Sequence, residues 1–403
     1  MKFFILLFLF LFFNPLFAKT YSPQELSFLV QERAPLIKIY LEQEQSGAIQ
    51  VKGSKLLANP VFTYQGGHAK TGTDGGHVMD FTLSQSIPWP GKRSSLVKSQ
   101  EFLLQISRLD LEEVKLHLSH RVFLLAYQLA FDTEVEKHNK ERKERFFIIS
   151  KYLSTRPIAS PKLILEKDLI ESQIRLVEKF MNEVTARKNG LKEELALLAG
   201  ISDFDISLDW SRIPALRGKN YYLSNLEEGF RLKKIKQQIL LGQNRIEEAR
   251  LEARPDITVG VNYRQENVSP RNYFYHGQVA VVIPILDRGQ YSVQFAKAQM
   301  RKDEAGAKLA LQENSTSLNY SYENLLAANE SLKLFPMSLR AKSKERFRKA
   351  EEAFRKGQID VMTFLQSDIQ VHDNIDLIYT SRLEYLQSLS ALELLVGNKM
   401  EFN

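Results

Sequence analysis

The sequence contains no cysteine among its 403 residues. This absence leaves the compartment open, because a cytosolic protein and a disulfide-free envelope protein can both lack cysteine. It does argue against a lipid anchor on a cysteine at a processed N-terminus. After the first residues no apolar run approaches about 18 residues, so no transmembrane helix is expected in the mature chain.

The sequence also lacks the residue sets that catalysis requires. No nucleophile, base and orienting group occur at a recognisable spacing, so an enzyme is not expected. The paired glycines at residues 66–67 and 75–76 lie outside the strand–glycine–helix context of a phosphate loop. We interpret them as turn residues, and no cofactor is predicted.

Two histidine pairs are candidates for a metal site. His117 and His120 are three residues apart on a predicted helix, and His68 and His77 bracket a predicted loop. Neither pair has a third ligand at a recognisable spacing. For the first pair, solvated helix residues are the preferred interpretation, and no metal site is predicted.

The N-terminus has the layout of a secretory signal. Lys2 precedes an unbroken apolar run over residues 3–13, followed by a helix-breaking Asn-Pro pair and then by Ala18 at an imperfect cleavage site. The run is too short to span a membrane, which takes about 20 residues. We therefore predict a signal peptide over residues 1–18 and an exported mature chain.

The sequence has an excess of basic residues, 55 against 48 acidic ones, and a formal net charge of +7. Basic runs at residues 137–145 and 340–356 contain acidic residues at helical spacing. Mixed signs at this spacing are typical of a solvated helix face. Because the chain is expected to be exported, a nucleic-acid partner is not predicted.

A strand pair occurs twice, at an offset of roughly 195 residues. Apolar and polar residues alternate toward Pro88 in the first copy and toward Pro284 in the second. Pro60 and Pro255 begin the preceding strands of the two copies. The sequence predicts β-hairpins over about residues 59–88 and 255–284, with loops at residues 66–76 and 266–273.

Long helices follow each hairpin. Residues 94–153 lack glycine and proline and carry two apolar columns at seven-residue spacing, one through Leu104 and Leu111 and the other through Leu116 and Phe123. After a turn at 154–161, a return helix is predicted over 162–198. The second copy repeats this pattern over about 288–397, with a kink expected at Pro336.

The predicted organisation is therefore a duplicated, mainly α-helical chain. The first repeat covers residues 19–202, with its helical hairpin over about 94–199. A connector covers 203–220, and the second repeat covers 221–403. Two short helices are expected before the first hairpin, and another helix over about 222–253.

Four membrane-length strands cannot close a barrel alone, since the smallest membrane barrels need about eight. Open sheet edges are not tolerated in lipid. The strands of this chain must therefore pair with those of sister subunits or stay outside the membrane. In the second case the hairpins would be soluble and packed on helices.

The order and duplication of these motifs resemble the TolC-like outer-membrane efflux proteins, the outer-membrane factors of tripartite export systems. The resemblance covers nearly the whole mature chain. It is carried by Asn59-Pro60, Gln85-Ser86-Ile87-Pro88 with Gly91-Lys92-Arg93, Ala253-Arg254-Pro255-Asp256-Ile257, Pro284-Ile285-Leu286-Asp287-Arg288-Gly289, and Phe354 with Gly357. The short loops and the Gly-Lys-Arg turn look most like the heavy-metal resistance-nodulation-division branch.

The resemblance implies a homotrimer with a shared 12-stranded β-barrel in the outer membrane and an α-helical barrel in the periplasm. It implies a passive exit duct for metal ions or small toxic solutes. A periplasmic membrane-fusion adaptor and an inner-membrane pump, of resistance-nodulation-division or ABC type, are the implied partners. The barrel boundaries would lie at Pro60, Pro88, Pro255 and Pro284.

The same resemblance places the periplasmic gate at the second helical turn, formed by Gly357, Asp360, Thr363, Gln366 and Asp368. The family commonly has an acidic residue where Thr363 stands here, and often where Gln366 stands, so an acidic ring is in question. Adaptor contacts are predicted at Arg156, Arg355 and Lys356. Two alternatives stay open: a duct for type I protein secretion, and a soluble periplasmic coiled-coil scaffold.

Overall fold

The computed structural model describes residues 19–155, 160–268 and 270–400. The predicted signal peptide, residues 1–18, lies outside the described residues. Contacts divide the chain into two compact units. We call them the sheet unit, residues 39–112 and 230–314, and the helical unit, which contains residues up to 38, 113–229 and the residues from 315 onward.

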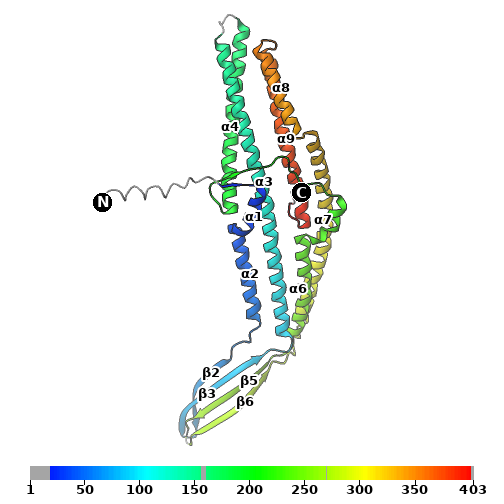
Figure 1. The fold of residues 1–403 in the computed structure, drawn as a ribbon. Helices are drawn as coiled ribbons and strands as arrows, with labels where there is room; N and C mark the ends of the chain where they lie inside the picture. Colours follow the sequence, from blue (N-terminus) through cyan, green and yellow to red (C-terminus); the bar gives the residue numbers. More distant parts are fainter. Residues whose placement is uncertain (1–18, 156–159, 269, 401–403) are drawn as a thin grey trace, which may run out of the picture. The chain divides into compact units, whose positions relative to one another are not determined.

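The sheet unit contains one four-stranded antiparallel sheet, in which the strands lie side by side (Figure 1). The strands are β2 (Val61–Thr71), β3 (Asp74–Ile87), β5 (Ile257–Glu266) and β6 (Asn272–Val281), in the spatial order β2-β3-β5-β6. β3 pairs with β5, with Ile87 opposite Ile257 and Val78 opposite Glu266. The two hairpins of the duplication therefore form one continuous sheet.

The first hairpin corrects one prediction. The expected loop at residues 66–76 is wrong, because β2 continues to Thr71 and β3 begins at Asp74. Gly72, with φ of +62°, makes the tight turn instead. Gly76 is needed inside the strand, since a Cβ there would lie 2.0 Å from the Asn267 carbonyl oxygen. Ladder pairing outweighs the turn propensity of these glycines.

Four helices in the sheet unit adjoin these strands in sequence: α2 (Pro35–Ser54), the first part of α3 (Lys92–Ser154), α6 (Phe230–Glu252) and the first part of α7 (Gln290–Leu334). Polar contacts join α3 to α6. Asn244 donates to the Ser95 carbonyl at 2.7 Å, and Ser99 donates to Glu248 at 2.6 Å. The predicted apolar column of α3 is buried here at Leu104 and Leu111.

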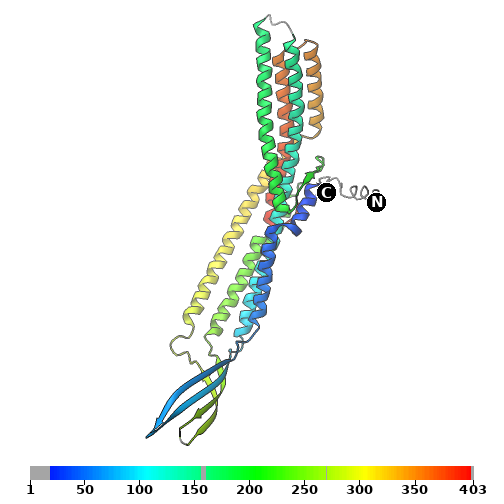
Figure 2. The same cartoon turned by 90° about the vertical axis from the view of Figure 1, so that its left-hand side faces the viewer.

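The helical unit contains α1 (Pro23–Arg33), the rest of α3, α4 (Pro161–Ala199), the end of α7, α8 (Ser338–Arg355) and α9 (Val361–Val396). Figures 1 and 2 show α3 beside α4 and α8 beside α9. Each residue of the seven-residue column on α9 is buried, namely Phe364, Val371, Ile378, Tyr385 and Leu392. Phe364 and Val371 of this column belong to a hydrophobic core cluster that also contains Phe146 of α3, Ile170 of α4 and Phe347 of α8.

The break between α7 and α8 lies at residues 335–337, where the sequence predicts a kink. Pro336 has no N–H to continue the helix. The Leu339 N–H donates to the Pro336 carbonyl, so the Phe335 carbonyl has no helical donor, and it accepts a hydrogen bond from Arg382 of α9 at 3.2 Å. Arg382 is only 4% exposed, so a buried cation satisfies the broken end of α7.

The region around the connector differs from the predicted helix over 222–253. It forms α5 (Lys219–Ser224) and a 3-10 turn at Leu226–Glu228 before α6 begins at Phe230. Gly229 interrupts the helix, because a Cβ there would lie 2.3 Å from the Leu395 carbonyl oxygen. Nor does the sequence predict the parallel pairing of β1 (Lys19–Tyr21) with β4 (Phe204–Ile206).

Candidate functional site: a two-faced sheet and a helical turn

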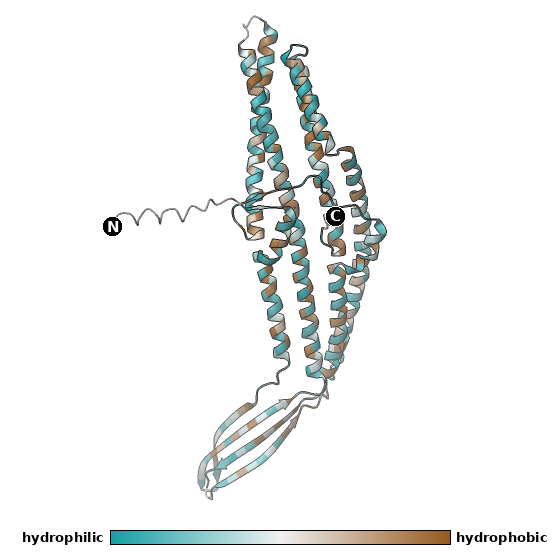
Figure 3. Ribbon diagram, viewed as in Figure 1, coloured by the Kyte–Doolittle hydropathy of each residue, from teal (hydrophilic) through white to brown (hydrophobic). Residues whose placement is uncertain are grey.

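The sheet has two chemically different faces. Directly opposite residues of an antiparallel pair point to the same side, so the register assigns every side chain to a face. One face, which we call the apolar face, includes Phe62, Tyr64, Met79, Phe81, Leu83, Ile87, Ile257, Val259, Val261, Tyr263, Tyr273, Tyr275, Val279 and Val281. Figure 3 shows the alternation of hydrophobic and hydrophilic residues along the strands.

An aromatic row crosses all four strands on the apolar face. The Phe81 ring lies 5.1 Å from Tyr64 and 6.0 Å from Tyr263, and Tyr263 lies 5.1 Å from Tyr275. Tyr64 and Tyr275 at the two ends of the row are 55% and 78% exposed in the single chain, whereas Phe81 and Tyr263 between them are half-buried. Such a band of amphipathic rings is typical of the water–lipid interface of membrane proteins.

The opposite face is mainly polar, although Val61, Val78, Phe274 and Ala280 also lie on it. It includes Thr63, Gln65, Asp80, Thr82, Ser84, Ser86, Thr258, Asn262, Arg264, Glu266, His276 and Gln278. Asn262 donates to Asp80 and, at 2.7 Å, to Thr82, while Arg264 pairs with Glu266 at 2.8 Å. A charged and hydrogen-bonded face opposite an apolar one is what a water-filled barrel requires of its strands.

The four predicted boundary prolines lie at the helix-side ends of the strands. Pro60 immediately precedes β2, Pro88 follows β3, Pro255 stands two residues before β5, and Pro284 lies three residues after β6. Proline cannot donate to the ladder, so these positions end the sheet without an orphan N–H.

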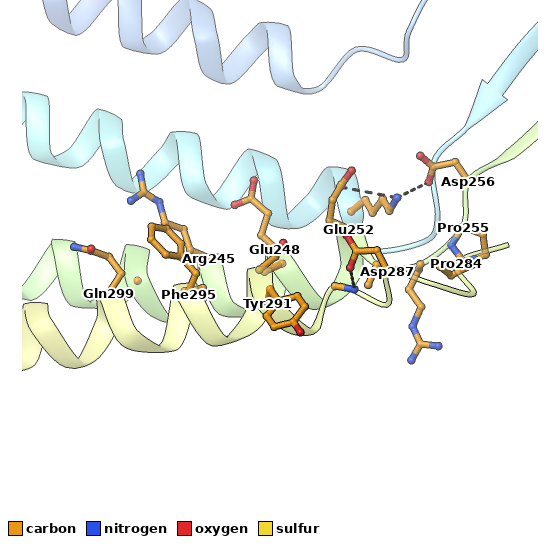
Figure 4. A pocket seen from close by; sticks show the side chains of 18 of the residues that line it. Arg245, Glu248, Glu252, Pro255, Asp256, Pro284, Asp287, Tyr291, Phe295 and Gln299 are labelled. Carbon is orange, nitrogen blue, oxygen red and sulfur yellow. Dashed lines mark hydrogen bonds and ion pairs between the residues drawn. The ribbon is translucent and has the colours of Figure 1, made fainter. Parts of the chain in front are cut away.

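A polar contact fixes the boundary between the two hairpins. The Asp256 carboxylate accepts from the Trp89 backbone N–H at 2.8 Å and pairs with Lys92 at 2.9 Å. These contacts hold the pKa of Asp256 below its ordinary value despite the opposing effect of desolvation. A cavity of about 910 Å³ lies beside this contact, between α6 and α7 (Figure 4). Tyr291 and Phe295 of α7 line it together with Arg245 of α6.

The turn between α8 and α9 contains the predicted gate residues. Gly357 has φ of +71° and closes α8 with two bonds, Gly357 N–H to the Phe354 carbonyl and Gln358 N–H to the Ala353 carbonyl, both at 2.9 Å. Asp360 then caps α9 by accepting from the Thr363 N–H at 2.9 Å. This hydrogen bond lowers the pKa of Asp360.

The other predicted gate residues differ in their solvent exposure. Thr363 and Gln366 are exposed on α9. Asp368 is buried, 3% exposed, and forms an ion pair with Arg142 of α3. Burial raises the pKa of Asp368, and the guanidinium of Arg142 opposes this effect. Asp368 therefore joins α3 to α9 and is not a free acid at the turn.

Two of the three predicted adaptor contacts, Arg355 and Lys356, lie at the same end of α8. Arg355 pairs with Glu351 one helical turn earlier, at 2.7 Å, and Lys356 is exposed at the end of the helix. Arg156 lies outside the described residues. A groove of about 270 Å³, lined by Arg145, Ile149, Phe354 and other residues of α3 and α8, adjoins Arg355.

A half-buried polar cluster next to the Arg142–Asp368 pair is missing from the sequence-based predictions. His138 of α3 stacks on His372 of α9 at 5.5 Å, and His372 lies 3.4 Å from Asp376. Burial lowers the pKa of His372 to about 4 and raises that of Asp376 to about 6. No local motif signals this cluster, because its members come from distant helices.

The two predicted histidine pairs have different environments. The expectation that His117 and His120 are solvated is wrong for His120, which is 2% exposed and bonds to Ser390 at 2.8 Å and to the Asn398 carbonyl at 3.0 Å. His68 and His77 are cross-strand partners with rings 5.4 Å apart. Within the described ranges, no group of three or more His, Cys, Asp or Glu residues could hold a metal ion.

Among the residues that the structure describes, no helix is both long enough and apolar enough to span a membrane.

The arrangement of long helices and paired hairpins defines the fold class, and comparison with solved structures identifies it. The Neisseria gonorrhoeae MtrE outer membrane channel in its open state matches with a TM-score of 0.77 at 12% identity, over 94% of this chain and 90% of that one. The Campylobacter jejuni CmeC outer membrane channel matches with a TM-score of 0.74 at 14% identity, over 94% and 86%.

A structure of CusC, described for its transmembrane channel formation, matches with a TM-score of 0.71 at 11% identity, over 94% of this chain and 92% of that one. At the level of sequence, neither a family model nor a curated protein matches. The structural likenesses confirm the predicted TolC-like fold, in which a mainly helical chain carries paired β-hairpins.

Proposed function

We propose that this chain is the outer-membrane channel of a tripartite efflux system, a passive duct through which cargo leaves the cell. The observation that carries the proposal is the four-stranded sheet with one exposed apolar face and one polar face. Val279 and Tyr275 on the apolar face are 72% and 78% exposed in the single chain. An apolar surface that extends over four strands and is left exposed requires a protein partner or a lipid environment.

The edges of the sheet support a shared barrel. Among the described residues, the outer edges of β2 and β6 have no strand partner. An unpaired edge is not tolerated in lipid, so β6 of one subunit would pair with β2 of the next. Such a head-to-tail contact closes into a ring. With three subunits the ring has about 12 strands, within the range of membrane barrels.

The length of the strands also suits a membrane. β5 and β6 have ten residues each, and about 9–11 residues cross a bilayer when a strand is tilted. The apolar face would then contact lipid and the polar face would line the duct. The soluble scaffold is the weaker alternative, because no described element covers the apolar face.

We further propose that the turn at residues 356–360 lies at the periplasmic end, with Thr363 and Gln366 facing the aperture. Arg355 and Lys356 would contact a periplasmic adaptor that connects the duct to an inner-membrane pump of resistance-nodulation-division or ABC type. Their exposure and their place at the end of α8 support this role. Replacing both with Glu should weaken adaptor cross-linking while trimers still assemble, and unchanged cross-linking would contradict the contact.

The proposed cargo is metal ions or small toxic solutes. The short strand connections and the Gly91-Lys92-Arg93 turn support it through their likeness to the heavy-metal branch. A strain that lacks this protein is then expected to become sensitive to metal salts or dyes. If it instead loses a secreted protein from the medium and keeps its resistance, the protein-secretion alternative is correct.

Two neighbouring residues of β6 provide a matched test of the barrel. Val279 lies on the apolar face and Gln278 on the polar face, and both are exposed in the single chain. Val279→Arg should disrupt membrane assembly, since an arginine on the lipid face costs about 2–4 kcal/mol near the midplane. Gln278→Arg should still assemble and should shift ion selectivity toward anions.

The measurements are outer-membrane fractionation, unheated gel electrophoresis and planar-bilayer conductance of the processed protein. Recovery of the unsubstituted protein as an outer-membrane trimer supports the duct. Recovery in the soluble periplasm, with equal behaviour of the two arginine variants, would mean that the hairpins are not barrel strands.

A further inference from the structure

A basic groove lies in the sheet unit at the start of α3. Its volume is about 540 Å³, and it is lined by Lys55, Gly91, Arg93, Ser94, Val97, Lys98 and Glu101. Lys55 follows α2, while Arg93 and Lys98 belong to the first two turns of α3. The groove therefore brings together cations from two segments that are distant in sequence.

The charges of the groove are not balanced within the chain. Lys55, Arg93 and Lys98 are exposed, and within the described ranges none of them has an ion-pair partner. Their neighbour Lys92, in contrast, pairs with Asp256. Three cations against the single acid Glu101 leave the groove positive. Arginine and lysine at this density are suited to a phosphate group.

The first turn of α3 adds to the positive electrostatic potential of the groove. It contains no acidic residue, although acids are favoured at a helix N-terminus. Instead, Lys92 and Arg93 occupy the first two helical positions. The partial positive charge at the N-terminus of α3 therefore adds to the positive charges of the side chains. A bound anion would offset both.

The position of the groove indicates which anion it would meet. Gly91 lies four residues beyond Ile87, the last residue of β3, which limits their separation to about 14 Å. Between them stands Trp89, which is 37% exposed, and tryptophan is enriched at water–lipid interfaces. A sheet embedded in lipid would place this groove at the level of the phospholipid headgroups.

The second hairpin also has exposed basic residues near its helix-side end. Arg254 precedes Pro255, Arg288 follows Pro284, and both arginines are exposed without an ion-pair partner in the described part of the chain. Acidic residues, among them Glu252 and Asp287, line the cavity there together with Arg254, so the excess of positive charge belongs to the groove beside the first hairpin.

We infer that the basic groove binds the phosphate headgroup of an anionic phospholipid in the periplasmic leaflet of the outer membrane. This inference rests on the proposed function, since it requires the sheet to lie in lipid. The lipid would offset part of the positive charge of the groove and fix the depth of the sheet in the membrane. Anionic lipids attract basic residues near the surface in this way.

Fluorescence of Trp89 can report whether lipid is close to the groove. It contains two tryptophans, Trp89 beside the groove and Trp210 in the helical unit, so Trp210→Phe leaves Trp89 as the only fluorophore of its kind. The full processed protein with this substitution is reconstituted into vesicles of phosphatidylethanolamine. Brominated phosphatidylglycerol or brominated phosphatidylcholine is then added, and quenching of Trp89 is measured.

Phosphatidylglycerol is expected to quench Trp89 at a several-fold lower mole fraction than phosphatidylcholine. The triple variant Lys55→Gln/Arg93→Gln/Lys98→Gln should quench equally with both lipids. A matched variant, Lys342→Gln/Lys344→Gln/Arg346→Gln, removes the same charge from exposed positions outside the groove and should keep the preference. Salt at about 0.5 M should reduce the preference for phosphatidylglycerol when the groove is unsubstituted, because salt screens the attraction between the headgroup and the cations. This measurement tests the electrostatic contribution without a new variant.

Two results would overturn the inference and leave the duct intact: equal quenching by both lipids before any groove substitution, or a preference that survives the triple variant. Absence of quenching by either lipid would have a different meaning. Trp89 would then not be near lipid, and the proposed membrane sheet itself would be wrong.

Discussion

Loss of the ion pair between Arg142 and Asp368 should strongly destabilise the helical unit. Both residues are buried, at 7% and 3% exposure, and they join α3 to α9. Asp368→Ala would leave the Arg142 guanidinium buried without its partner and close to Arg145. Removing one member of a buried pair typically costs about 3–5 kcal/mol, because the remaining charge is desolvated and uncompensated.

An exposed pair on α8 provides the control. Arg348 and Glu345 are within 2.9 Å, and their side chains are 60% and 49% exposed. Glu345→Ala should therefore cost about 0–1 kcal/mol. The double substitution Arg142→Met/Asp368→Leu should recover most of the stability lost in Asp368→Ala, since it removes both charges and fills the space with apolar atoms.

Thermal unfolding of the reconstituted protein, followed by circular dichroism, measures these differences. Amide hydrogen exchange over residues 361–396 reports whether α9 loosens first. The same variants test the gate, because α9 begins at the proposed aperture, and Asp368→Ala is expected to increase the fraction of time that the channel is open. If Asp368→Ala is no more destabilising than Glu345→Ala, the assignment of a stabilising buried pair is wrong.

Two further predictions concern single residues. Burial lowers the pKa of His120 from 6.5 to about 4, so between these values the unfolded chain takes up a proton that the folded chain does not. Acidification from pH 7 to 4 should cost roughly 3 kcal/mol at this site, and thermal unfolding of His120→Gln should show a smaller dependence on pH. Gly357→Ala should destabilise the turn by about 1–2 kcal/mol through backbone strain at its positive φ, with Gly357→Asn less affected. As a control, Gly190→Ala within α4 should stabilise by about 1 kcal/mol; equal effects at the two glycines would contradict the strain argument.

The two faces of the sheet explain why the proposed function would depend on assembly. A single chain supplies four strands and an apolar face that it does not cover. The polar face carries Asp80, Arg264 and Glu266, whose charges would line the duct of an assembled barrel. Selectivity in the barrel would therefore depend on residues that repeat around a ring.

Local patterns in the sequence determined the positions of many strands, helix faces and turns in this protein. Strand alternation before Pro88 and Pro284, the seven-residue column from Phe364 to Leu392, and Gly357 at the turn each follow from backbone geometry over a few residues. Periodicity fixes which residues share a face, and proline and glycine fix where an element ends, so these features need no knowledge of distant contacts.

Only the tertiary structure decided which side chains contact one another across distant helices. The burial of His120, the pairing of Asp368 with Arg142, and the meeting of His138 with His372 each join helices that are far apart in sequence. A charged or imidazole side chain looks the same in sequence whether it is solvated or buried, because burial depends on packing against remote elements. For the same reason, residues 66–76 look like a loop in sequence, whereas ladder pairing extends both strands through them.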